Sequence, residues 1–240
     1  MQLYFIRHGQ SANNLRYEQT LSSAGRVDDP ELTETGHLQA QCLARLLSRP
    51  GVDRAINYDE HNIRGFGLTH IYCSLLVRAI DTASYVSKAL QLPLVGLESI
   101  HEAGGVYLDD PETGEPHGKP GKSRAYLAER FPHLTLPDEM HNDGWWNCRP
   151  RETSPQAAER ASRVLAWLLE THGGTDHRVA LVSHAAFSYY FFCAVLKIPY
   201  ENGPWIGLGN TCITRYDFLP EEVRVVYVNR GDHLPPELVT

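Results

Sequence analysis

A histidine stands between an arginine and a glycine directly after an apolar run near the start of the chain. Residues 3–6 are leucine, isoleucine or aromatic, which predicts a buried strand, and Arg7, His8 and Gly9 follow it at once. Ligands of open α/β sheets bind just outside the carboxyl ends of the strands, where these three residues would lie. A histidine by itself is more often structural. This position, beside a cation and a glycine that lets backbone approach a ligand closely, favours a functional role.

Two later strand ends carry similar residues. Residues 178–183 are mostly apolar and lead into His184, and the apolar run 68–73 precedes a predicted helix that holds Arg78 in its first turn. The guanidinium of an arginine can meet a phosphate through two parallel hydrogen bonds. Arg78 alone would be interpreted as a surface helix residue, but together with the first motif it indicates a phosphate site.

Separated motifs in this chain resemble, in order, those of the histidine phosphatase superfamily, also called the phosphoglycerate mutase-like family. The first is Arg-His-Gly-Gln-Ser-x-x-Asn at residues 7–14, and Leu-Thr-x-x-Gly follows at 32–36. Ser-x-x-x-Arg-Ala-x-x-Thr-Ala lies at 74–83 and Val-Ser-His at 182–184. Ala185 departs from the family's usual glycine, which makes close contact between that backbone and a phosphate less expected.

The resemblance implies a role for each matching residue. His8 would be the nucleophile, and Glu102, which follows a predicted strand and precedes two glycines, would be the proton donor, with Glu98 as the fallback. The other catalytic residues implied are Arg7, Arg78 and His184. The residues implied to bind substrate are Arg7, Gln10, Asn14, Arg78, His184 and Ala185. The motif at 32–36 would form a wall of the site, and no cofactor is implied.

The chemistry of these side chains agrees with such a site. His8 can attack phosphorus only through an unprotonated nitrogen, and a carbonyl that accepts from its other nitrogen, such as that of Gly9, would hold this tautomer. Attack would give a phosphohistidine, which splits one difficult step into two. Glu102 would protonate the leaving oxygen and then activate water, help that is typically worth ~10²–10⁴ in rate.

Length and periodicity indicate one sizeable domain. The 240 residues, with 42% hydrophobic content, suit a single α/β domain over residues 1–240. We expect a three-layer α/β/α sandwich whose central sheet is mostly parallel. Helices are predicted over 37–48, 75–90 and 154–172, and strands over 3–6, 68–73, 92–97 and 178–183, with a closing hairpin from 209–216 and 223–228.

Two segments do not match the family pattern. Residues 52–67 are polar and predict a loop or short insertion. Residues 103–153 are rich in proline, glycine and charge, with one helical piece near 123–131, and predict an inserted cap that would govern substrate choice. This segment holds Trp145 and Trp146, which could stack on a ligand but are more often the core anchor of an irregular insert.

Composition excludes several classes of protein. The net charge is −7 without any basic block, which argues against nucleic-acid binding. The five cysteines are odd in number and dispersed, which argues against a disulfide framework and for a reducing compartment. No apolar run reaches membrane-spanning length, residues 185–196 included, and no signal-peptide pattern is present, so we expect a cytoplasmic protein. The sequence does not indicate an oligomeric state.

Three motif-like stretches lack the context of the sites they resemble. Cys73 and Arg78 are separated by four residues, whereas the cysteine phosphatase loop has five. Residues 116–123 nearly fit a P-loop but lack its first glycine and a preceding strand, and His101-Glu102 lacks the second histidine of the zinc-protease motif. The twelve histidines look scattered along the chain, so we expect no metal site.

The sequence therefore predicts a metal-independent phosphomonoesterase that acts on a small phosphorylated substrate through His8. A phosphoglycerate mutase-type phosphotransferase is the alternative within the family, although the longer basic loop of the classical mutases is not found. A binding or regulatory protein with low turnover is the alternative of another class. The particular ester is not indicated by any motif.

Overall fold

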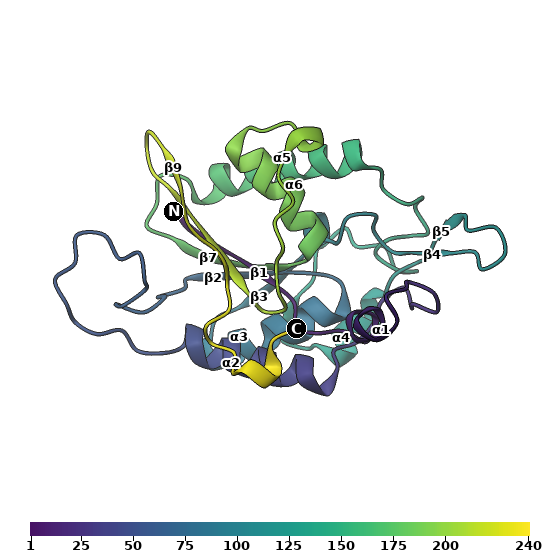
Figure 1. Cartoon of the computed structure of the whole chain (residues 1–240), viewed down its shortest axis with the longest axis horizontal. Helices are drawn as coiled ribbons and strands as arrows, with labels where there is room; N and C mark the ends of the chain where they lie inside the picture. Colours follow the sequence, from purple (N-terminus) through teal and green to yellow (C-terminus); the bar gives the residue numbers. More distant parts are fainter.

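A seven-stranded sheet forms the centre of the computed structural model, which describes all residues from 1 to 240 (Figure 1). Its strand order is β6-β3-β2-β7-β1-β8-β9. The first five strands in this order run parallel, and β8 and β9 are antiparallel to their neighbours. The strands are β1 (Gln2–Arg7), β2 (His70–Ser74), β3 (Leu94–Leu97), β6 (Leu134–Thr135), β7 (Arg178–Ser183), β8 (Ile213–Phe218) and β9 (Val223–Arg230).

Strand β1 shows why the molecule has three layers. Its residues alternate between the two faces of the sheet, because successive side chains of a strand point in opposite directions. Tyr4 and Ile6 join one hydrophobic cluster, whereas Leu3 and Phe5 join the other, and all four are fully buried. A strand in contact with two cores must be covered by helices on both sides.

Helices cover the two faces as predicted. Helices α2 and α3 lie on one face of the sheet, and α5 and α6 lie on the other (Figure 1). The three-layer α/β/α arrangement is therefore confirmed. The helices are α1 (Ala12–Thr20), α2 (Glu34–Leu47), α3 (Val77–Leu90), α4 (Arg124–Arg130), α5 (Ser154–His172) and α6 (Ala185–Leu196), with short 3₁₀ turns at Glu98–Ile100, Tyr200–Asn202 and Pro236–Leu238.

Helix α1 was not predicted from the sequence. It contains no buried residue, so it shows no apolar periodicity. Its start is fixed by a capping box, in which the Ser11 hydroxyl accepts from the Asn14 backbone and the Asn14 side chain accepts from the Ser11 backbone.

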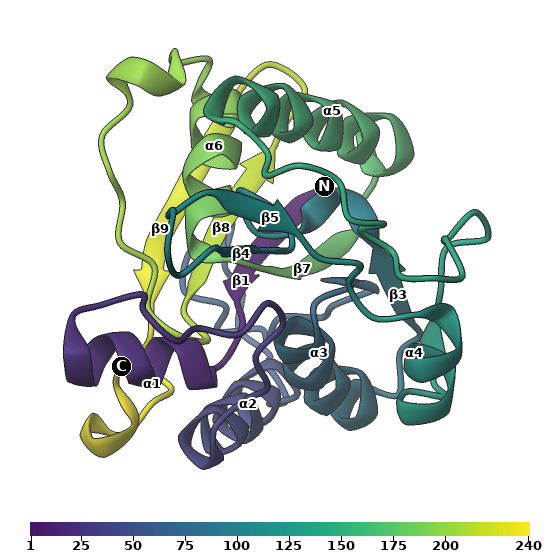
Figure 2. The same cartoon turned by 90° about the vertical axis from the view of Figure 1, so that its right-hand side faces the viewer.

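The segment 103–153 is partly built into the main core. It forms a hairpin of β4 (Tyr107–Asp109) and β5 (Pro116–Gly118), which Figure 2 shows in front of the sheet, and then α4 and the edge strand β6. Trp145 and Trp146 are buried in the same cluster as Tyr4. The interpretation of the two tryptophans as anchors of the insert is therefore confirmed.

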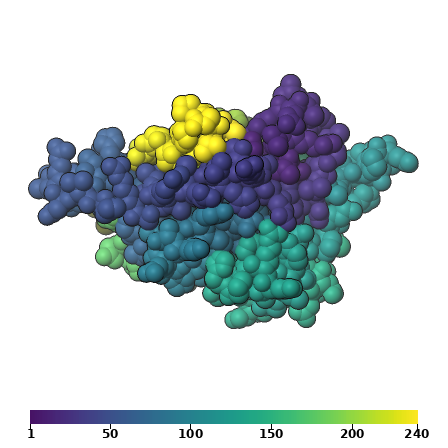
Figure 3. All heavy atoms as spheres, turned by 90° about the horizontal axis from the view of Figure 1, so that it is seen from below, coloured from purple at the N-terminus to yellow at the C-terminus, as the bar shows by residue number.

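The predictions of a loop over residues 52–67 and of a closing hairpin are also confirmed. Residues 52–67 contain no helix or strand and project as a lobe at one end of the molecule (Figure 3). Strands β8 and β9 form the expected closing hairpin. None of the helices combines the length and the apolar character needed to cross a membrane.

Candidate active site

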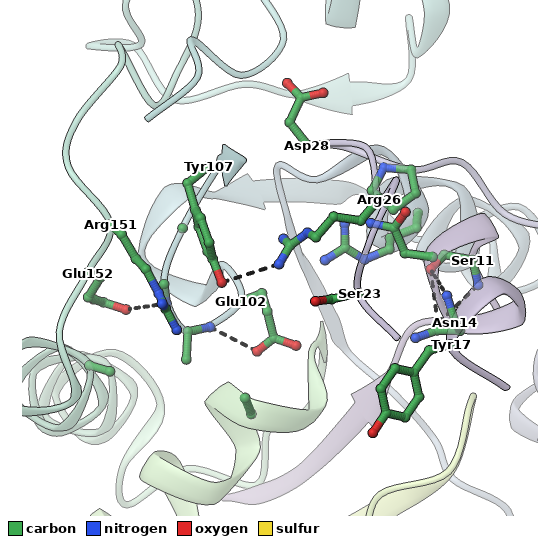
Figure 4. Close-up of a pocket in the computed structure, with 18 of the residues that line it drawn as sticks. Ser11, Asn14, Tyr17, Ser23, Arg26, Asp28, Glu102, Tyr107, Arg151 and Glu152 are labelled. Carbon is green, nitrogen blue, oxygen red and sulfur yellow. Dashed lines mark hydrogen bonds between the residues drawn. The ribbon is translucent and has the colours of Figure 1, made fainter. Parts of the chain in front are cut away.

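A cavity of about 500 Å³ lies at the carboxyl ends of β1 and β7, against the start of α1 and α3. Figure 4 shows side chains from several separate segments pointing into it. Five of the residues singled out in the sequence line this cavity, namely Arg7, His8, Asn14, Arg78 and Glu102.

The imidazole of His8 is buried and held from both sides. Its Nδ1 lies 2.6 Å from the carbonyl oxygen of Gly9, and since a carbonyl only accepts, Nδ1 carries the proton. Its Nε2 then accepts from Nε of Arg78 at 3.1 Å. Burial, followed by the positive charges of Arg78 and Arg7, lowers the pKa of His8 well below its usual range. The ring is therefore neutral, with its lone pair on Nε2.

Arg78 is set by the helix that carries it and by one buried carboxylate. It is the second residue of α3, and its guanidinium lies 3.8 Å from Asp29. The same carboxylate accepts from the backbone N–H of Val77 at 3.0 Å. Burial raises the pKa of Asp29 to about 6, although Arg78 opposes this shift. The Nη1 atom of Arg78 is the one that faces Asp29 at this distance, and it is buried without a hydrogen-bond partner in the protein.

Arg7 and Asn14 add donors at the same wall. Arg7 donates through Nη1 to the carbonyl of Leu208 at 2.7 Å, which holds its guanidinium while Nε stays unpartnered. The side-chain oxygen of Asn14 accepts from the Ser11 backbone at 3.1 Å. Because the capping box occupies this oxygen, the amide nitrogen of Asn14 is the group left to face a ligand.

Glu102 reaches the cavity from the opposite side, and its carboxylate is labelled in Figure 4. One oxygen accepts from the backbone N–H of Ala103 at 2.8 Å and from that of Phe187, in the first turn of α6, at 3.0 Å. This leaves the second oxygen unbonded. The fallback Glu98 does not line the cavity and instead pairs with Arg149 at 2.5 Å.

His184 lies behind His8. It is fully buried at the start of α6, and its ring centroid is 5.1 Å from that of His8. Neither of its ring nitrogens has a hydrogen-bond partner in the protein. Burial, followed by the nearby Arg78, lowers the pKa of His184 well below its usual range, so its ring is neutral.

Gln10, His184 and Ala185, all implied to bind substrate, are not among the residues that line the cavity. The Gln10 side chain is occupied, because it accepts from Thr33 at 2.7 Å and donates to Glu18 at 2.9 Å. Ala185 begins α6, and its neighbour Ala186 is the residue on the wall.

The structure requires glycine at position 9 for a reason other than the close approach of a ligand that we inferred from the sequence. Gly9 is not on the cavity wall, and a Cβ at this position would lie 2.6 Å from the carbonyl oxygen of Gly36. The glycine therefore permits the loop after β1 to pack against the start of α2, not a ligand to approach the backbone.

The outer wall of the cavity contains residues that the sequence did not single out. Tyr107 stands between two guanidiniums, with Arg26 4.6 Å and Arg151 4.8 Å from its ring centroid. Arg26 also donates to the Tyr107 hydroxyl at 3.2 Å (Figure 4). Trp205 and Tyr189 complete this side. These residues come from separate loops and helices and share no motif. The sequence pointed only to Tyr107 and Arg151, through the expectation that residues 103–153 form a cap over the site.

The expectation that the histidines are scattered is wrong for three of them. His70, His172 and His177 each place a ring nitrogen within 4.8 Å of the others. They lie at the amino ends of β2 and β7, away from the cavity.

The family model of the histidine phosphatase superfamily (branch 1) matches residues 3–59 and 60–231. The chain belongs to the histidine phosphatase superfamily. No curated protein sequence matches it.

Solved structures of several phosphatases share its fold. A phosphoserine phosphatase mutant from Entamoeba histolytica, in complex with phosphoserine, is 20% identical over 98% of this chain and 99% of that one, with a TM-score of 0.59. The α-ribazole phosphatase of Shigella flexneri is 21% identical over 96% and 97%, with a TM-score of 0.62. A mycobacterial glucosyl-3-phosphoglycerate phosphatase is 22% identical over 95% and 98%, with a TM-score of 0.60.

Proposed function

We propose that this histidine phosphatase homologue is a metal-independent phosphomonoesterase that forms a phosphohistidine on His8. The observation that supports this most is the state of His8, which is neutral, protonated on Nδ1 and turned with Nε2 toward Arg78. An imidazole in this state can attack phosphorus without first losing a proton. Arg7, Arg78 and Glu102 line the same cavity.

In the first step, Nε2 of His8 forms a bond to phosphorus while the bond to the ester oxygen breaks. Arg7 and Arg78 stabilise the charge on the transferring phosphoryl group, and Asn14 and His184 add neutral donors. The leaving oxygen takes a proton from Glu102. The products of this step are the free alcohol and a phosphohistidine.

In the second step, a water molecule attacks the phosphorus of the phosphohistidine. Glu102, now ionised, accepts a proton from this water, and the bond from Nε2 to phosphorus breaks. Inorganic phosphate leaves, and His8 and Glu102 return to their starting protonation states.

We further infer that the substrate carries a second anionic group. Arg26 and Arg151 flank Tyr107 on the cavity wall, and neither guanidinium is within ion-pair distance of a carboxylate. The nearby Glu152 is paired with Arg160 at 2.7 Å and does not neutralise them. A carboxylate or second phosphate on the substrate fits this pair of cations.

The position of Tyr107 and Arg151 supports a role for residues 103–153 as the cap of a single domain that spans residues 1–240. Two of the similar structures bear names with such substrates, since phosphoserine and glucosyl-3-phosphoglycerate carry a carboxylate beside the phosphate. These names support the class of substrate and not a particular ester.

The first test compares wild type with His8→Ala for phosphate release from a panel of monoesters in EDTA. Wild type is expected to hydrolyse part of the panel, and His8→Ala to show neither turnover nor labelled phosphate trapped on protein. His117→Ala, which alters an exposed histidine of β5, is the matched control. Full activity of His8→Ala would overturn the mechanism. If wild type releases nothing, the hydrolase proposal fails, and interconversion of 2- and 3-phosphoglycerate is tested next.

A second test separates the two candidate acids. Glu102→Gln is expected to reduce kcat by ~10²–10⁴ while inhibition by inorganic phosphate persists, because the amide keeps the shape but cannot transfer the proton. Glu98→Gln, which alters the carboxylate paired with Arg149, is expected to retain wild-type kcat. If Glu98→Gln lost activity and Glu102→Gln kept it, Glu98 would be the proton donor instead.

A third test addresses the second anionic group. Phosphoserine and phosphoethanolamine differ by one carboxylate, and Arg26→Ala is expected to reduce kcat/KM about tenfold for the first only, the scale of one lost hydrogen bond to a charged group. Arg54→Ala, at an exposed arginine of the 52–67 loop, is the control. An unchanged ratio of the two kcat/KM values in Arg26→Ala would overturn the inferred substrate class while leaving the phosphatase proposal intact.

A further inference from the structure

Three imidazoles lie close together at the amino ends of the parallel strands, at the end of the sheet opposite the cavity. His70 begins β2, His172 ends α5 and His177 immediately precedes β7. Their ring centroids form a nearly regular triangle, with separations of 4.7 Å between His70 and His172, 4.5 Å between His70 and His177 and 5.2 Å between His172 and His177. Three separate segments thus present the side chain that divalent transition metals most often bind.

Two of these rings have a neighbour that fixes which nitrogen faces the centre of the triangle. The Thr69 hydroxyl donates to the carbonyl of Arg178 at 3.2 Å, so it accepts from Nδ1 of His70 at 2.8 Å and leaves Nε2 free. The Tyr72 hydroxyl lies 3.1 Å from Nε2 of His172, which leaves Nδ1 free. Metal-binding histidines characteristically donate their other N–H to such a partner.

The free nitrogens already lie close together. The Nδ1 atoms of His172 and His177 are 2.9 Å apart, and one ligand nitrogen from each of the three residues lies within 4.8 Å of the others. In a tetrahedral zinc site with bonds of 2.0–2.1 Å, ligand nitrogens are about 3.3 Å apart. Rotation of the partly exposed side chains of His70 and His177 would bring the three ligand nitrogens to this spacing.

Two cationic groups lie near the triangle, and both are engaged with backbone carbonyls. The amino terminus of Met1 donates to the carbonyl of Thr175 at 2.7 Å. The nearest guanidinium, that of Arg178, is turned away and donates to the carbonyl of Phe66 at 2.9 Å. A change of tautomer at His177 would release both Nδ1 lone pairs without the loss of a proton.

We propose that His70, His172 and His177 bind one first-row divalent cation, with zinc as the first candidate and water as the fourth ligand. The site joins the start of β2, the end of α5 and the start of β7, so bound metal stabilises the folded chain. It lies at the amino ends of the parallel strands, whereas the cavity lies at their carboxyl ends, so it takes no part in the phosphatase reaction.

The test is a titration of the metal-free full chain with Zn²⁺ against a chromophoric chelator. One equivalent is expected to bind to wild type, about 100-fold more weakly to His70→Ala and His177→Ala, and about tenfold more weakly to Tyr72→Phe. Both histidines are partly exposed, so these variants are expected to fold, which circular dichroism checks. His117→Ala is the matched control and should bind as wild type does.

Two further readouts separate this site from surface binding. Co²⁺ is expected to give the visible absorption of a tetrahedral nitrogen site in wild type and not in His177→Ala. Zn²⁺ is expected to raise the Tm of wild type alone. Equal affinity of wild type and the double variant His70→Ala/His177→Ala would overturn the proposal. Activity in EDTA tests only the phosphatase proposal, so the two can fail separately.

Discussion

The nucleophilic state of His8 depends on contacts that act on single atoms. The Gly9 carbonyl fixes the proton on Nδ1, and burial with two nearby cations keeps Nε2 unprotonated. The sequence was sufficient to predict the partner carbonyl, because Gly9 directly follows the histidine. It could not show the close approach of Gly9 to Gly36, which brings together residues from two separate elements.

Gly9→Ala is expected to destabilise the chain and reduce activity together. The added Cβ would lie 2.6 Å from the Gly36 carbonyl oxygen, so the loop after β1 must move, at a cost of about 1–3 kcal/mol. Movement of this loop displaces the carbonyl that holds His8, which lowers kcat. Urea unfolding and steady-state kinetics measure the two effects. Gly207→Ala is the control because no atom lies within 4 Å of a Cβ built there. Equal effects of the two substitutions would contradict the argument.

At the scale of elements, the sequence predicts those with a buried face. Helices α2, α3 and α5 each bury one side, and their apolar spacing was enough to place them. Helix α1 buries nothing, so only its Ser11-x-x-Asn14 cap could have indicated it. The N-cap of α5 is Thr153, whose side chain pairs with that of Gln156, and the predicted start at Ser154 is the first helical residue. Cap geometry depends on backbone angles that residue type alone does not fix.

Ser11→Ala is expected to loosen α1 because this helix has a cap but no buried face. Loss of an N-cap typically costs about 1 kcal/mol. Amide hydrogen exchange over residues 12–20 should become faster, and KM should rise because Asn14 loses the hydroxyl contact of Ser11 at 3.0 Å and keeps only the backbone contact at 3.1 Å. Thr153→Ala removes the equivalent cap from α5 and should leave exchange in α1 unchanged. Unaltered exchange in Ser11→Ala would show that tertiary contacts hold α1 instead.

Replacement of Trp146 is expected to affect stability, whereas replacement of Trp205 is expected to affect substrate binding. Trp146 is 4% exposed and packs in the main core, so Trp146→Ala should lower the free energy of unfolding by about 3–5 kcal/mol. Trp205 is 68% exposed on the cavity wall, so Trp205→Ala should change KM and leave stability unaltered. Urea unfolding and kinetics on both variants measure this contrast. If Trp205→Ala lost stability and Trp146→Ala did not, the roles assigned to the two tryptophans, core anchor and cavity wall, would be wrong.

At the scale of the whole molecule, the part of the cavity around His8 could be predicted from the sequence, whereas the outer wall could not. The part around His8 collects residues after β1 and at the start of α3, and the topology of a parallel sheet brings such positions together. The outer wall joins Arg26, Tyr107, Arg151 and Trp205 from loops and a short hairpin. Their meeting depends on how irregular segments pack, which no period or local motif encodes.

Buried neutral histidines are spread through the whole fold. Burial lowers the pKa well below the usual range for His8, His101 and His184, and to about 4 for His172 and His233. Between pH 6.5 and 4 the unfolded chain therefore binds more protons at these positions than the folded chain does. Asp29 and Asp81 act in the opposite direction, since burial raises the pKa of both carboxyls, to about 6 for Asp29, and their folded forms take up a proton first. Two carboxyls do not offset five imidazoles.

The free energy of unfolding is therefore expected to fall as pH decreases from about 6.5 to 4, because a state that binds fewer protons is disfavoured by acid. Urea midpoints measured across this range in EDTA, which removes any contribution from bound metal, test the prediction. His233→Gln keeps a side chain able to reach Thr211 but cannot titrate, so the slope of stability against pH should become smaller. His117→Gln alters an exposed histidine and should leave the slope unchanged. A slope that is the same in all three proteins would show that His233 titrates alike in the folded and unfolded chains.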